Sequence, residues 1–219
     1  MSLSWLNIVF ECGCLGVSLF FLRKNRDTFS KITIGYLALV VMVEISGLIW
    51  GALYRKNNSW IYNIYSIFEA SYICLGFYHL FAKKIFNPLW MVVLTHLVFI
   101  ICYIAETFYH GFFKYHIVTT TIVSVCFTLL SLVYFYRLIR HDKAFNLQYY
   151  SSFWWVAAIF IYYFGGTMYN LFVFYAIQHN HGLHILIYTM IMLNFLLYSI
   201  WSYSFICSYR HRKLLPSLQ

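Results

Sequence analysis

Seven apolar runs, each long enough to cross a lipid bilayer as a helix, dominate this chain of 219 residues. Only 10% of the residues are charged and 63% are hydrophobic, whereas a soluble domain carries about 25% charged residues. The runs cover residues 4–22, 32–54, 60–82, 87–108, 115–136, 152–177 and 183–206. The sequence therefore predicts an all-α polytopic membrane protein with seven transmembrane helices.

The connections between these runs are short, and the longest covers residues 137–151. They leave no room for a folded domain outside the bilayer. We expect a single seven-helix bundle over residues 1–206, followed by a short basic tail over residues 207–219. The first run has no basic segment before it and no small-residue cleavage site after it, which predicts a retained helix rather than a signal peptide.

The lysines and arginines are divided unevenly between the two predicted membrane faces. One face holds Arg23, Lys24, Arg26, Lys31, Lys83, Lys84, Arg137, Arg140, Lys143, Arg210, Arg212 and Lys213. The other face holds only Arg55, Lys56 and Lys114. Because positive residues favour the cytoplasmic side, twelve against three predicts an N-terminus outside and a C-terminus inside.

Four glutamates, Glu11, Glu44, Glu69 and Glu106, lie inside the predicted helices, although a carboxylate at membrane depth is costly unless it is paired, protonated or hydrated. At 1.5 Å per residue, Glu11, Glu44 and Glu69 lie about 10, 14 and 13 Å below the outer ends of their helices. Carboxylates that close together cannot all be ionised without a cation. We therefore predict an outward-facing polar pocket that binds a small ligand, a cation or a proton.

Other polar side chains fall at a similar depth. The predicted ligand-binding residues are Glu11, Glu44, Glu69, Asn170, Asn194, Tyr65 and Tyr72. An alternative is that each glutamate is protonated and hydrogen-bonds between helices, which would serve packing specificity alone. Glu106 lies near the outer interface, where water reaches it, and is expected to be structural. The inner half offers little beyond His79, His96 and Ser131.

A histidine-rich segment follows the sixth run. Its His181 and His184 suit Zn²⁺ or Cu²⁺, and a nearby carboxylate would complete such a site. The spacing matches no standard set of ligands, and Gly182 disfavours a helix that would bring the two imidazoles to one face. We expect a solvated loop here, with a zinc site as the alternative.

No lysine lies inside a predicted helix, which excludes a retinal Schiff base, and the paired HxxxH pattern of ceramidase-like membrane hydrolases is missing from the last helix. The segment NNSWIYNIY at residues 57–65, followed by Glu69, resembles a signature of small, largely uncharacterised seven-helix membrane proteins of Bacteroidota. This resemblance covers about 13 residues. It implies a location in the bacterial cytoplasmic (inner) membrane and no particular activity.

These features favour a non-enzymatic protein that acts as a sensor or receptor, or that assists a membrane protein partner through its basic face. A metal-dependent membrane hydrolase acting on lipid and a structural subunit of a larger membrane complex are the alternatives. The net charge of +9 does not indicate nucleic-acid binding, because the basic residues lie in short clusters between apolar runs. Such clusters suit the anionic headgroups of the lipid bilayer.

Overall fold

The computed structural model describes residues 4–23, 25, 27–54, 57–82, 89–141, 149–179 and 183–214, and for residues 4, 141, 174–179, 183–185 and 214 only the course of the backbone. Within these ranges the chain forms seven α-helices and no strand. They are α1 (Ser4–Leu22), α2 (Thr28–Tyr54), α3 (Ser59–Ala82), α4 (Leu89–His110), α5 (Ile117–His141), α6 (Ser151–His179) and α7 (Leu183–Leu214). The predicted all-α class is confirmed, and α7 continues well beyond residue 206 into the predicted tail.

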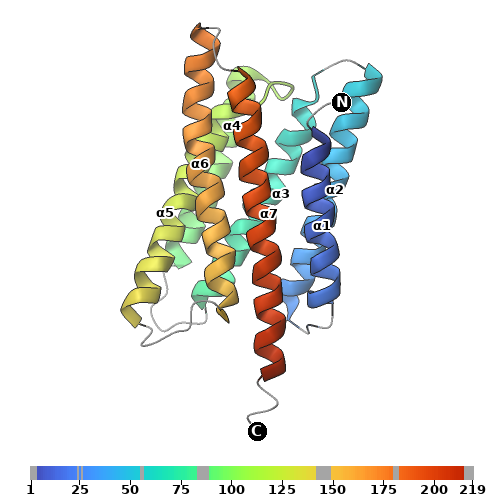
Figure 1. Ribbon diagram of the computed structural model, residues 1–219. Helices are drawn as coiled ribbons and strands as arrows, with labels where there is room; N and C mark the ends of the chain where they lie inside the picture. The colour runs from blue at the N-terminus through green and yellow to red at the C-terminus, as the bar shows by residue number, and fades with distance from the viewer. Residues whose placement is uncertain are drawn as a thin grey trace.

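The helices stand side by side as one elongated bundle, with the start of α1 at one end and the end of α7 at the other (Figure 1). Each helix packs against its neighbours in the chain, and α1 packs against α7, which closes the seven helices into a ring. α3 also contacts α5 across this ring. Side chains that face inward therefore meet groups from several helices at once.

Six of the described helices are long and apolar enough to cross a membrane: α1, α2, α4, α5, α6 and α7. The chain therefore has the architecture of an integral membrane protein. α3 has 24 residues, but it carries Asn63, Glu69 and His79 and is not among the six. The count of seven spans and the orientation of the N-terminus stay predictions.

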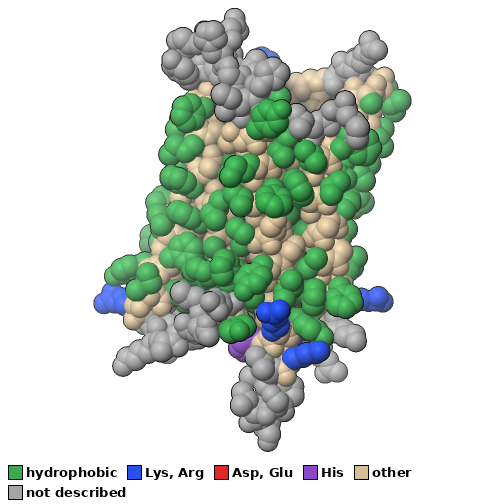
Figure 2. Space-filling view, in the orientation of Figure 1, with side chains coloured by type: hydrophobic (Ala, Val, Ile, Leu, Met, Phe, Trp, Pro, Cys, Tyr) green, Lys and Arg blue, Asp and Glu red, His purple; other side chains and the backbone are tan. Residues whose placement is uncertain are grey.

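The surface of the bundle suits this architecture. Figure 2 shows hydrophobic side chains along its length and basic side chains near the end from which the C-terminus emerges. We call this end the basic end, and the basic residues there include Arg137, Arg140, Arg210 and Lys213. The loop between α4 and α5 lies at the opposite end.

Aromatic side chains fill the middle of the ring. The rings of Tyr36 and Tyr72 stack with their centroids 3.9 Å apart, and the indoles of Trp155 and Trp201 are parallel with centroids 6.3 Å apart. All four side chains are buried. We call these four residues the aromatic layer, and a polar cavity lies on each side of it.

Candidate functional site

The first cavity has a volume of about 360 Å³ and lies between α3, α5 and α6, toward the end opposite the basic end. We call it the Glu69 cavity. Its polar lining includes Glu69, Tyr115, Thr119, Tyr162, Tyr163 and Asn170. Among its described lining residues Glu69 is the one charged group, so the cavity has a negative character whenever that carboxyl is ionised.

Hydrogen bonds hold the polar groups of this cavity in place. The Tyr163 hydroxyl donates to Oε1 of Glu69 at 2.9 Å, which orients the carboxyl from the facing helix α6. The side-chain amide of Asn170 donates to Oγ1 of Thr121 at 3.0 Å, which ties α6 to α5. Two of the predicted ligand-binding residues, Glu69 and Asn170, thus lie in one cavity.

Glu11 and Glu44 lie elsewhere, beyond the described lining of the Glu69 cavity. They interact electrostatically with each other, from α1 and α2. Glu11 is buried and hydrogen-bonds with Tyr198, while its Oε2 has no partner among the described residues. Glu44 accepts a hydrogen bond from the Tyr62 hydroxyl at 3.2 Å. The three glutamates are therefore divided between two places: Glu69 lines the Glu69 cavity, and Glu11 and Glu44 lie outside its described lining.

One tyrosine connects these two groups. Tyr162 lines the Glu69 cavity and interacts electrostatically with Glu69, Glu44 and Glu11. All three carboxyls consequently face the interior of the ring, although they do not share one cavity.

The remaining predicted ligand-binding residues have other surroundings. The hydroxyls of Tyr65 and Tyr36 form a hydrogen bond of 2.6 Å, and Tyr72 belongs to the aromatic layer. Asn194 on α7 is half-buried and lines neither cavity as described.

The metal candidates His181 and His184 lie outside the residues whose side chains are described, so the zinc alternative stays a prediction. Within the described part of the chain, no group of three or more His, Cys, Asp and Glu residues could hold a metal.

A second cavity, which we did not expect from the sequence, lies at the basic end and has a volume of about 550 Å³. We call it the Arg212 cavity. Polar side chains from the α1–α2 connection, α2, α3, α6 and α7 line it. They include Asn25, Asp27, Ser30, His79, Ser204 and Arg212. The inner half of the bundle is thus more polar than predicted, because groups that are scattered along the sequence converge there.

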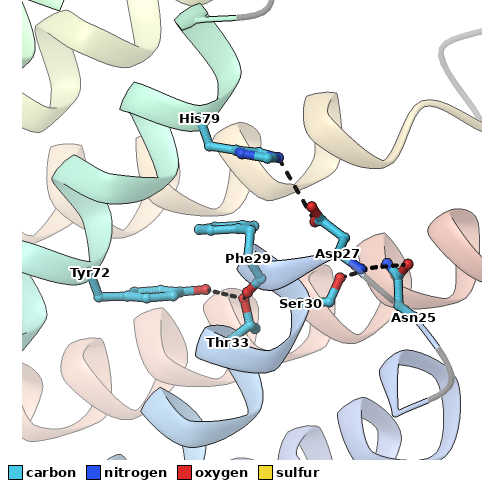
Figure 3. Close-up of polar contacts among 7 residues, drawn as sticks. All are labelled: Asn25, Asp27, Phe29, Ser30, Thr33, Tyr72 and His79. Carbon is cyan, nitrogen blue, oxygen red and sulfur yellow. Dashed lines mark hydrogen bonds and ion pairs between the residues drawn. The ribbon is translucent and has the colours of Figure 1, made fainter.

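Figure 3 shows the part of this cavity nearest the aromatic layer. Nε2 of His79 lies 3.8 Å from Oδ2 of Asp27. The ring of Phe29 stacks on His79 at 5.3 Å and on Tyr72 at 5.8 Å, so it lies between them. The Tyr72 hydroxyl donates to Oγ1 of Thr33 at 3.1 Å. A polar region therefore extends from the cavity to the aromatic layer.

With both cavities described, we compared the chain with known proteins. No protein-family model, curated protein or solved structure matches it.

Two buried polar residues shape the rim of the Glu69 cavity without lining it. The amide of Asn63 donates to the carbonyls of Phe112 and Lys114, both at 2.8 Å, and so fixes the loop between α4 and α5. Glu106 accepts hydrogen bonds from the backbone N–H of Val118 and Thr119, at 3.1 and 2.7 Å. Its carboxylate therefore caps the start of α5, in keeping with a structural role. The expectation that water reaches Glu106 was wrong, because its side chain is buried.

Proposed function

We propose that this protein is a non-enzymatic integral membrane protein that binds a small organic cation, such as a protonated amine, in the Glu69 cavity. One observation carries the proposal: the carboxyl of Glu69 is the one charged group in the described lining of this interior cavity. A carboxyl in low-dielectric surroundings gains far more from a cationic partner than it would in water.

The other lining residues suit the same class of ligand. Tyr162, Tyr163 and Tyr169 offer aromatic faces, which attract a cation through the ring quadrupole. The hydroxyls of Thr119 and Thr120 are further polar groups for orienting a ligand. A volume of about 360 Å³ falls in the range of small-molecule sites.

We further propose a sensor-like or receptor-like role, in which ligand binding at one end changes the basic end, where a membrane protein partner would be engaged. This requires the predicted orientation, with the Glu69 cavity facing outside and the basic end in the cytoplasm. The resemblance to Bacteroidota membrane proteins and the excess of basic residues at one end support a bacterial cytoplasmic membrane.

The proposal differs from the alternative in which Glu69 serves packing alone. A carboxyl that served helix packing alone would need only a hydrogen bond such as the one from Tyr163. It would not need to line a cavity, as the carboxyl of Glu69 does. The hydrolase alternative depends on His181 and His184, whose side chains are not described, and the structural-subunit alternative makes no use of the cavity.

The test is thermal unfolding of the detergent-solubilised protein with phenethylamine or choline as the probe, and with NaCl and benzoate as comparisons. We expect the ammonium probes to raise the unfolding temperature of the wild-type protein and of Glu44→Gln, but not of Glu69→Gln. Glu44→Gln is the matched control, because it removes an interior carboxyl outside the described cavity lining. Stabilisation of Glu69→Gln equal to that of the wild type, or no stabilisation of the wild type, would overturn the proposal.

A further inference from the structure

One face of α3 carries Glu69, Tyr72, Gly76 and His79, at the spacing of three and four residues that places side chains on the same side of a helix. Glu69 lines the Glu69 cavity and His79 lines the Arg212 cavity. The two residues are about 15 Å apart along the helix axis, and Tyr72 lies between them in the aromatic layer. α3 therefore connects the two cavities with groups that can carry a proton.

We propose that this protein transfers protons through the bundle along α3, with Glu69 and His79 as the two terminal proton-binding groups and the hydroxyls of Tyr65, Tyr36 and Tyr72 between them. The proposal uses the Glu69 cavity as the access route for protons, but it does not require the cationic ligand proposed above.

The hydroxyl groups between the two cavities are already hydrogen-bonded. Tyr36 and Tyr65 are joined at 2.6 Å, and either oxygen could be the donor, so this bond can be reversed. Tyr65 lies one helical turn from Glu69 on the same face of α3, which places the hydrogen-bonded pair close to Glu69. The Tyr72 hydroxyl donates to Thr33, and Thr33 lines the Arg212 cavity. Hydroxyls therefore reach from one cavity toward the other.

The surroundings of α3 suit proton transfer. Six other described helices are apolar enough to face lipid, while α3 is not among them. Ionisable groups that face the interior of a membrane bundle are a mark of proton relays. Trp155 and Trp201 pack around Tyr72, with centroids 6.3 and 5.9 Å from its ring, and exclude bulk water from this level. A layer two helical turns thick separates the cavities along α6, from Tyr162 to Trp155.

The transfer moves one proton and changes no other bond. A proton from water in the Glu69 cavity binds the carboxylate of Glu69. Each hydroxyl then accepts a proton on its oxygen and passes its own proton to the next group. Because the Phe29 ring lies between Tyr72 and His79, the Tyr72 hydroxyl passes its proton to Thr33, which lines the Arg212 cavity. Water in that cavity then carries a proton to the imidazole of His79, where the carboxylate of Asp27 at 3.8 Å stabilises the cation, and the proton leaves into the Arg212 cavity. A membrane potential or a pH difference drives the net movement.

The stack of Tyr36 on Tyr72 acts as a gate in this path. Their contact is ring against ring, with centroids 3.9 Å apart and planes inclined by 8°. A proton passes between the Tyr36–Tyr65 pair and the Tyr72 hydroxyl only after one ring rotates or a water molecule enters. The path is therefore closed in this conformation and opens by a small side-chain movement.

The experiment measures proton uptake by liposomes containing the purified full chain. A potassium diffusion potential set by valinomycin drives uptake, and a pH-sensitive dye inside the vesicles reports it. We expect wild-type uptake well above that of protein-free vesicles, and at least a tenfold slower rate in Tyr72→Phe, which keeps the stacked ring and removes only the hydroxyl. His79→Gln is expected to slow uptake similarly.

Tyr103→Phe is the matched control, because this α4 tyrosine lines neither cavity as described, and it should retain the wild-type rate. Folding of each variant is verified by circular dichroism and gel filtration. Wild-type uptake no faster than that of empty vesicles, or an undiminished rate in Tyr72→Phe, would overturn the proton path. The probe-binding assay with phenethylamine separates the two proposals, because Tyr72→Phe should still bind the probe while Glu69→Gln should not.

Discussion

Gly76 of α3 lies directly against the indole of Trp155 of α6, so that a Cβ atom at Gly76 would overlap Cη2 of the ring. The absence of a side chain at this position lets the indole reach the interior of the ring. There Nε1 of Trp155 donates to the Tyr72 hydroxyl at 3.4 Å. The position of Trp155 in the aromatic layer, which separates the two cavities, therefore depends on this glycine.

Replacing Gly76 with alanine should destabilise the protein by about 1–3 kcal/mol, the usual cost of overpacking a filled core. Trp155 is 4% exposed and hydrogen-bonded, so it cannot move aside without disturbing Tyr72. Chemical unfolding followed by tryptophan fluorescence measures the loss. Gly51→Ala is the control, because no atom lies within 4 Å of a Cβ built there. Equal stability of the two variants would contradict the packing described.

Glu106→Gln should destabilise the protein by about 1–3 kcal/mol, because the buried carboxylate accepts two backbone hydrogen bonds and one from the Thr119 hydroxyl. An amide in its place turns an N–H group toward these donors. Glu69→Gln, which alters the hydrogen bond that the Tyr163 hydroxyl donates, should lose only about 1 kcal/mol. Thermal unfolding of both variants tests the difference, and the reverse order of stability would refute the assignment of Glu106 as the structural carboxyl.

The basic end should face the cytoplasm when the protein is made in a bacterial cell, because arginines and lysines are retained on that side. A green fluorescent protein joined after Gln219 should therefore fluoresce, while alkaline phosphatase joined at the same position should be inactive. Active phosphatase with a dark fluorescent protein would show the opposite orientation. In that case the Glu69 cavity would face the cytoplasm, and the sensor-like role would lose its basis.

Part of the candidate site could be predicted from the sequence. Glu69 and Asn170 were predicted to lie at one level, and they line one cavity, because helical rise converts sequence position directly into depth. Depth alone does not say which residues meet. Glu11 and Glu44 were predicted at a similar level, yet they lie outside the described lining of that cavity.

The Arg212 cavity was missed for a related reason. Asp27 precedes α2, His79 is near the end of α3 and Arg212 is near the end of α7, and no spacing along the chain connects them. The one local signal was the polar segment from Asn25 to Ser30, in which the Asn25 amide donates to the Ser30 hydroxyl at 2.7 Å. The packing of α2 against the following helix α3 brings that segment to His79, and the packing of α7 against α1 brings Arg212 to the same cavity.

The all-α class, the approximate bounds of the seven helices and the height of each polar group along its helix follow from the sequence, because a bilayer requires long apolar runs and a helix has a fixed rise. Which helix faces meet follows only from the three-dimensional packing. α2 and α6 are apolar around most of their circumference, so no stripe of residues specifies their rotation. That rotation is decided by packing, and it is packing around Gly76 and Trp155 that separates the two cavities.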